Sequence, residues 1–197
     1  MPADQRQITR ADLIPVTQYG KERAERRKAI IPVKKLRRVE VGPHATFYFE
    51  SYDTMWLQVH EMLYIERGGE EQIADELRAY NPLIPQKGEL VATLMFEIDD
   101  EGQRGRILRQ LTNIEETAFL DVGGEKIKAN FETDVDRTAA DGKTSSVHFL
   151  RFRLNAKQVA KFRDASVNVM LGFTHANYGH LATVPAATRV ELGKDLG

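Results

Sequence analysis

The 197-residue sequence contains no cysteine. This absence excludes disulfide bonds, thiol catalysis, iron–sulfur clusters and zinc sites built on cysteine. It does not argue against a stable fold, because a chain of this length can bury a full hydrophobic core without cross-links. No apolar run approaches the roughly 18 residues of a membrane span, and the opening segment, MPADQRQITR, lacks the apolar core of a signal peptide. The sequence therefore predicts a cytoplasmic protein without a membrane segment.

A net charge of one sign is also missing, since 28 Lys and Arg residues stand against 29 Asp and Glu residues. The charges are nevertheless separated: residues 1–40 hold 11 basic and 5 acidic side chains, whereas residues 41–100 hold 3 basic and 12 acidic ones. We call residues 21–38 the basic arm. No aromatic side chains interleave its basic ones, which argues against stacking on single-stranded nucleic acid. We expect the arm to pack on acidic surface, of its own chain or of a second copy in a homo-oligomer, and not on nucleic acid.

The hydrophobic pattern mixes helices and strands without regular alternation, which favours an α+β fold over a doubly wound sheet. Helices are predicted over residues 18–35, with a kink or interruption near Pro32, and over residues 52–67, 70–80, 101–114, 155–164 and 185–196. Strands are predicted over residues 38–41, 46–50, 89–98, 118–122, 126–132, 145–154 and 167–175. We expect one α+β domain, residues 9–197, with a mainly antiparallel sheet flanked by helices. Residues 1–8 are predicted to be disordered or loosely attached.

Motifs that identify common enzyme classes are absent. There is no GxGxxG, Walker loop, HExxH, GxSxG or EF-hand pattern in the chain. This argues against a dinucleotide enzyme, a P-loop NTPase, a zincin and an α/β-hydrolase. Any chemistry must therefore come from scattered His, Glu, Asp, Tyr and Arg side chains.

Three polar side chains fall on apolar faces of their predicted elements. His148 and His175 continue the apolar faces of their strands, and Glu66 continues the apolar stripe of the helix over residues 52–67. Because buried imidazole and carboxylate groups need partners, we predict that the three line one polar pocket. Histidine and carboxylate without cysteine suit iron, manganese or zinc, so the same set is the predicted site of a divalent metal. Each also has a structural interpretation, with the histidines bonded to backbone carbonyls and Glu66 either turned to water or paired with Arg67 or an arginine of the basic arm.

The predicted pocket depends on how the two strands are arranged. If the strands that carry His148 and His175 are antiparallel neighbours, the two histidines meet. If the helix between them makes a parallel crossover, they lie at opposite ends of the sheet, and a linker of about a dozen residues permits either arrangement. His60 lies at the edge of its helical stripe and Glu61 on the far side, so neither is predicted to belong to the site.

Seven segments of the chain are distinctive: ITRADLIP, RRVEVGPH, QVHEMLYIER, AYNPLIP, LVATLMFEI, TSSVHFLRF and HANYGH. Together they resemble an uncharacterised bacterial family known as domain of unknown function 3501. The positions that match the family pattern are His44, Glu61, Glu66, Arg67, His148, Arg151, His175 and Tyr178. The resemblance adds four pocket candidates, namely His44, Arg67, Arg151 and Tyr178.

The resemblance implies a setting rather than a mechanism. Members of the family look to be encoded beside rubrerythrin-like di-iron proteins and iron–sulfur oxidoreductases, which implies iron or peroxide redox metabolism and a redox-protein partner. Two hypotheses follow. The first is an accessory or binding protein whose histidines are structural. The alternative is a metal-dependent enzyme that uses Fe, Mn or Zn at His148, His175 and Glu66. The sequence favours the first, because spacing alone assembles no complete catalytic set.

Overall fold

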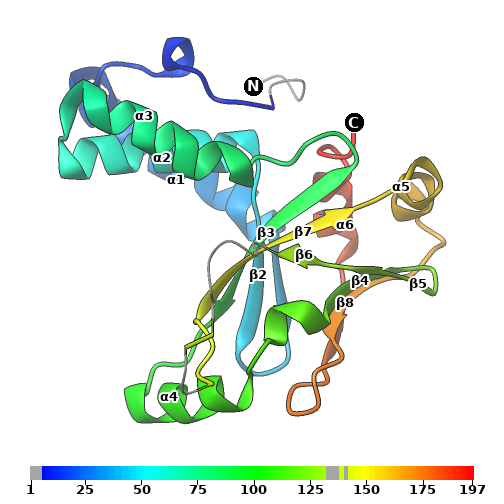
Figure 1. The fold of residues 1–197 in the computed structure, drawn as a ribbon. Helices are drawn as coiled ribbons and strands as arrows, with labels where there is room; N and C mark the ends of the chain where they lie inside the picture. The colour runs from blue at the N-terminus through cyan, green and yellow to red at the C-terminus, as the bar shows by residue number, and fades with distance from the viewer. Residues whose placement is uncertain (1–5, 132–137, 140–141) are drawn as a thin grey trace.

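Two antiparallel β-sheets and six α-helices make up the part of the chain that the structure describes (Figure 1). The structure is a computed structural model, and it describes residues 6–131, 138–139 and 142–197. The helices are α1 (Val16–Leu36), α2 (Tyr52–Glu66), α3 (Gly69–Tyr80), α4 (Glu101–Gln110), α5 (Ala156–Arg163) and α6 (Ala186–Leu192). Short 3-10 helices are η1 (Arg10–Asp12), η2 (Asn81–Leu83) and η3 (Ile114–Thr117). None of the helices in these ranges combines the length and the apolar character that crossing a membrane requires.

The strands fall into a larger and a smaller sheet. They are β1 (Arg38–Val41), β2 (Ala45–Phe49), β3 (Glu89–Phe96), β4 (Ala118–Val122), β5 (Glu125–Lys128), β6 (Asn130–Phe131), β7 (Val147–Arg153), β8 (Val169–Phe173) and β9 (Leu181–Thr183). The larger sheet has the order β1-β2-β3-β7-β6 and the smaller one β5-β4-β8-β9. Every neighbouring pair is antiparallel, which confirms the predicted α+β class. The strands are divided between two sheets, and β7 and β8, which belong to different sheets, are neither neighbours nor joined by a parallel crossover.

The main hydrophobic core lies between the two sheets. Side chains alternate along each strand of the larger sheet, so that Phe47 on β2 faces the core and packs against Phe173 of the smaller sheet, with ring centroids 5.3 Å apart. The next residue, Tyr48, faces outward. On the outer face of the larger sheet, Val91 and Phe149 pack against a second apolar cluster, which belongs to the helices.

The helices α1, α2 and α3 form a layer that covers part of this outer face (Figure 1). The apolar face of α2 holds the layer together, with Trp56, Val59 and Leu63 buried against α1 and the sheet. α1 is continuous through Pro32, so the helix is not interrupted there. The larger sheet therefore lies between the helical layer and the smaller sheet.

The basic arm forms most of α1 and packs on its own chain. Arg23 donates two hydrogen bonds, 2.9 and 2.8 Å long, to the carboxylate of Glu61 on α2. Just after α1, the buried guanidinium of Arg37 pairs with Glu191 and Asp195. Docking on carboxylates of the same chain is thus confirmed for these two arginines. The partners of Arg37 come from the C-terminal region, and not from the acidic segment 41–100.

The N-terminal segment is attached to the helical layer from Ile8 onward. Ile8 is buried, and the side chain of Asn81 bonds to both its N–H (2.7 Å) and its carbonyl oxygen (2.9 Å). The indole N–H of Trp56 donates to the carbonyl oxygen of Asp12 at 2.9 Å. Ile8, the last residue of the segment predicted to be disordered or loosely attached, is thus held by Asn81, whereas residues 1–5 lie outside the described residues.

Candidate functional site

His148 points into the core between the sheets, as its strand pattern predicted, and it is buried. Its Nε2 lies 2.9 Å from the carbonyl oxygen of Ser145, and its Nδ1 lies 3.6 Å from the carboxylate of Glu115. The ring of Phe96 packs edge-on against the imidazole, with centroids 6.2 Å apart. This histidine thus forms a buried polar pair with a carboxylate that the sequence did not single out.

The other two predicted metal ligands lie elsewhere. His175 is half-buried after β8, where its Nε2 lies 3.1 Å from the carbonyl oxygen of Thr112 and its Nδ1 accepts from the N–H of Asn177 at 3.2 Å. Glu66 is exposed at the end of α2, and the larger sheet separates that helix from His148. The structure does not bring the three side chains together. Within the described ranges, no group of three or more His, Asp or Glu side chains is arranged to hold a metal ion.

Tyr178 joins two of the distinctive segments, RRVEVGPH and HANYGH. Its buried hydroxyl accepts from the N–H groups of His44 and Ala45 and donates to the carbonyl oxygen of Val41, each at 2.9 Å. Burial raises the pKa of Tyr178. Gly42, in the same turn, has a φ of +70°, and a Cβ there would lie 2.9 Å from the Tyr178 hydroxyl. These two pocket candidates, His44 and Tyr178, therefore close a turn.

Arg151 joins AYNPLIP to TSSVHFLRF in the same manner. Its guanidinium donates to the buried carboxylate of Glu89 at 3.3 Å and to the carbonyl oxygen of Pro82. Arg153 bonds to the second oxygen of Glu89 at 3.2 Å. Arg67 is exposed after α2, in the left-handed conformation with a φ of 56°. Arg151 therefore anchors a loop on β7, and Arg67 ends a helix.

Two residues that the sequence analysis set aside have defined roles. His60 is buried, with its Nδ1 2.7 Å from the carbonyl oxygen of Trp56 and its Nε2 accepting from the N–H of Ile14 at 3.2 Å. These bonds require the neutral ring, and burial lowers the pKa of His60. The guanidinium of Arg23 holds the pKa of Glu61 below its usual value. Both residues meet partners outside their own helix, which a helical pattern cannot show.

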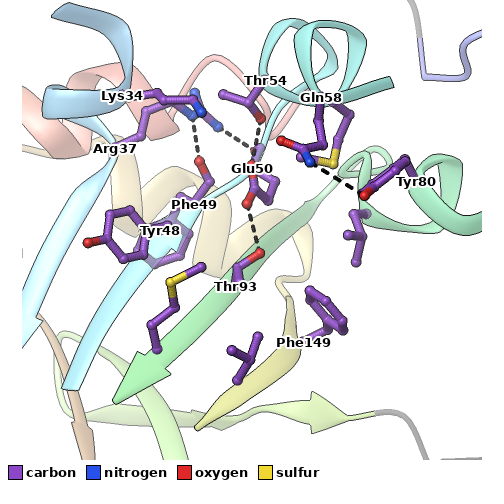
Figure 2. A pocket seen from close by; sticks show the side chains of 14 residues that line it. Lys34, Arg37, Tyr48, Phe49, Glu50, Thr54, Gln58, Tyr80, Thr93 and Phe149 are labelled. Carbon is purple, nitrogen blue, oxygen red and sulfur yellow. Dashed lines mark hydrogen bonds between the residues drawn. The ribbon is translucent and has the colours of Figure 1, made fainter. Parts of the chain in front are cut away.

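A cavity of about 460 Å³ lies between the helical layer and the outer face of the larger sheet (Figure 2). The described residues that line it are Lys34, Arg37, Tyr48, Phe49, Glu50, Thr54, Met55, Gln58, Tyr80, Leu83, Thr93, Met95, Val147 and Phe149. Most are apolar or aromatic, and a few polar groups converge among them. None of the predicted metal ligands belongs to this lining.

The carboxylate of Glu50 lies among these side chains, where two hydroxyls reach it (Figure 2). Its Oε2 accepts from the hydroxyl of Thr54 and its Oε1 from the hydroxyl of Thr93, both at 2.7 Å. Glu50 directly follows β2, Thr54 is in the first turn of α2, and Thr93 is on the outer face of β3. The change from strand to helix thus places the carboxylate over the sheet. Each oxygen keeps a further lone pair that can accept a hydrogen bond.

Arg37 fixes the backbone beside this carboxylate. Its Nε donates to the carbonyl oxygen of Phe49 at 3.0 Å, and a terminal nitrogen donates to that of Glu50 at 2.8 Å. Its charge is paired with carboxylates of the C-terminal region. Among the described residues, no Lys, Arg or His nitrogen lies within 4.0 Å of the Glu50 carboxylate, and exposed Lys34 at the cavity forms no ion pair. Glu50 is thus a half-buried carboxylate without a counter-ion.

Similarity to known proteins extends over nearly the whole chain. The family model described as "Protein of unknown function (DUF3501)" matches residues 7–196. A crystal structure of a protein of unknown function from Burkholderia pseudomallei K96243 has a TM-score of 0.89 and 36% sequence identity, over 97% of this chain and 100% of that chain. No curated protein matches the chain. The resemblance inferred from the seven segments is confirmed.

Proposed function

This chain belongs to the DUF3501 family of proteins of unknown function, and we propose that it is an accessory protein that binds a small molecule in the cavity around Glu50. The cavity itself is the observation that carries the proposal. Small-molecule sites are concave, mostly apolar and roughly 300–1,000 Å³ in volume, with a small number of polar groups that fix the ligand's orientation. The space between α2 and the larger sheet has each of these properties.

The side chains of the cavity support binding rather than catalysis. Its described lining contains no histidine, and Arg37 is occupied by backbone carbonyls and carboxylates. The hydroxyls of Thr54 and Thr93 hold Glu50 as an acceptor. An acceptor held in this way recognises a donor group on a ligand.

Family resemblance supports the setting that we propose for this binding. We place the protein in the cytoplasm, in iron or peroxide redox metabolism, with a rubrerythrin-like protein or an iron–sulfur oxidoreductase as partner. Nucleic acid is not a proposed partner, because Arg23 and Arg37 of the basic arm are paired with carboxylates of their own chain. The metal-dependent enzyme is the alternative, and the separation of Glu66 from His148 counts against it.

A fragment screen by ligand-observed NMR tests the proposal. The screen is run on the protein and on the variant Val147→Phe, which puts a larger side chain into the cavity wall. Fragments that bind the protein should lose binding to this variant and keep it in Ile65→Phe, a matched change at an exposed residue outside the cavity. Failure to find a fragment whose binding Val147→Phe reduces would overturn the proposal.

A further inference from the structure

The unpaired carboxylate of Glu50 specifies the charge of the ligand. We propose that the ligand is an organic monoamine, bound as its ammonium ion with Glu50 as counter-ion and with its apolar body along the outer face of the larger sheet. This inference rests on the proposed function of the cavity. It adds the chemical class of the ligand.

The surroundings of the Glu50 carboxylate favour a cationic ligand. An ionised carboxylate that is partly removed from water is costly unless hydrogen bonds and an opposite charge compensate it. The hydroxyls of Thr54 and Thr93 supply two hydrogen bonds to Glu50. The protein supplies no opposite charge within 4.0 Å in its described residues. The ligand is therefore the source of the missing positive charge.

The hydrogen-bonding pattern selects a donor head group. The hydroxyl of Thr93 donates its single hydrogen to Glu50, so its oxygen can only accept from a ligand. Together the Glu50 carboxylate and the Thr93 oxygen present acceptors and no donor. An ammonium group has three donors and no acceptor, which matches this pattern. A carboxylate placed against Glu50 and Thr93 would meet acceptors and a like charge.

The other lining residues indicate the charge and the polarity of the rest of the ligand. Met55, Met95, Val147 and Phe149 form apolar walls on two sides, which suits an aliphatic or aromatic body. Lys34 also lines the cavity and is exposed, so a second positive charge on the ligand would be repelled there. These residues favour a monoamine with an apolar body over a polyamine.

Three probes of the same shape test the head group. Binding of 4-phenylbutylamine, 4-phenylbutan-1-ol and 4-phenylbutanoate is measured by NMR titration of the full-length protein at pH 7. The amine should bind about tenfold more tightly than the alcohol, as expected for a charge-assisted hydrogen bond, and the carboxylate should bind most weakly. The backbone signals of Glu50 and Thr93 should shift with the amine.

Variants assign the preference to Glu50. Glu50→Gln removes the charge and turns one acceptor oxygen into an NH2 donor, so it should abolish the preference for the amine over the alcohol. Thr93→Val keeps the shape of the wall and should weaken the amine more than the alcohol, because it removes an acceptor and a hydroxyl that holds the Glu50 carboxylate. Glu125→Gln, which neutralises an exposed carboxylate paired with Lys161, should change neither affinity. If thermal unfolding shows that Glu50→Gln is not folded, Thr93→Val decides.

The outcomes separate this inference from the proposed function. If the alcohol or the carboxylate binds as tightly as the amine, or more tightly, and loses binding in Val147→Phe, the assignment of the ligand as an amine is overturned. This result leaves the proposed binding function in place. Amine binding that survives Glu50→Gln also overturns the inference. If none of the three probes binds, but other fragments bind and lose binding in Val147→Phe, only the amine assignment is overturned. If no fragment binds in that manner, both proposals fall.

Discussion

The backbone N–H of His44 donates a 2.9 Å hydrogen bond to the hydroxyl of Tyr178, 134 positions further along the chain. The same hydroxyl accepts from the N–H of Ala45 and donates to the carbonyl oxygen of Val41, so one side-chain oxygen closes the β1–β2 hairpin. The strand that leaves this turn is β2, and β2 ends next to Glu50. The hydrogen bonds of Tyr178 therefore fix the start of β2, and the end of β2 leads to the Glu50 carboxylate in the cavity.

Tyr178→Phe should destabilise the fold without changing its shape. The substitution removes the hydroxyl that bonds a part-buried N–H group, a buried N–H group and a buried carbonyl oxygen, and we expect a loss of about 1–3 kcal/mol in the free energy of unfolding. Urea denaturation measures it. Tyr80→Phe is the control, since the Tyr80 hydroxyl accepts only a 3.4 Å bond from Gln58 among the described residues. Equal losses in the two variants would show that the turn does not depend on this hydroxyl.

Arg37→Met should be the more severe change. It leaves the carboxylates of Glu191 and Asp195 without their buried cation, which costs about 3–5 kcal/mol when one partner of a buried pair is removed. Arg10→Met breaks the exposed pair with Glu70 and should have a much smaller effect, because solvent screens that pair. Both are compared by urea denaturation. A loss for Arg37→Met as small as that for Arg10→Met contradicts the structural role assigned to Arg37.

His60 should make stability depend on pH in the mildly acidic range. Burial, with a smaller contribution from the charge of Arg26, lowers its pKa below the usual 6.5 in the folded protein. The unfolded chain then takes up the proton more readily, so the stability that His60 contributes is fully present above pH 6.5 and is lost as the pH falls through the lower folded pKa. Protonation also puts a hydrogen on Nε2, where the N–H of Ile14 already points.

The measurement is the free energy of unfolding at several pH values, for the protein and for His60→Gln, which does not titrate. The difference between the two should shrink as the pH falls. Glu61, whose pKa is held down by Arg23, adds a loss at still lower pH that both proteins share. Parallel stability curves for the protein and the variant would refute the assignment to His60.

His148→Ala should reduce stability and leave the metal content unchanged. The change removes a buried imidazole bonded to Ser145 and leaves Glu115 beside a void, at a cost of about 1–3 kcal/mol. Elemental analysis of protein purified without a histidine tag should find no stoichiometric Fe, Mn or Zn in either form. One equivalent of metal that disappears in His148→Ala, but not in His60→Ala, would support the metal-dependent alternative.

The local elements could be predicted from the sequence because they follow from short-range periodicity. The helix predicted over residues 52–67 corresponds to α2, and the strands predicted over 38–41 and 118–122 coincide with β1 and β4. Alternation along β7 correctly placed His148 on the inner face. In each case the neighbours that decide the conformation are within a few positions along the chain.

Only the tertiary structure decided which of these faces meet. Periodicity shows that His148 faces inward, but it carries no information on which sheet a strand joins, and β7 and β8 join different ones. The helical pattern placed Glu61 on the far side of its helix, but a pattern within one helix cannot show that α1 brings Arg23 against that side. The cavity was beyond sequence reasoning for the same reason. Glu50 follows β2 and Thr93 lies on β3, and only antiparallel pairing of β2 with β3 and the packing of α2 bring their side chains together.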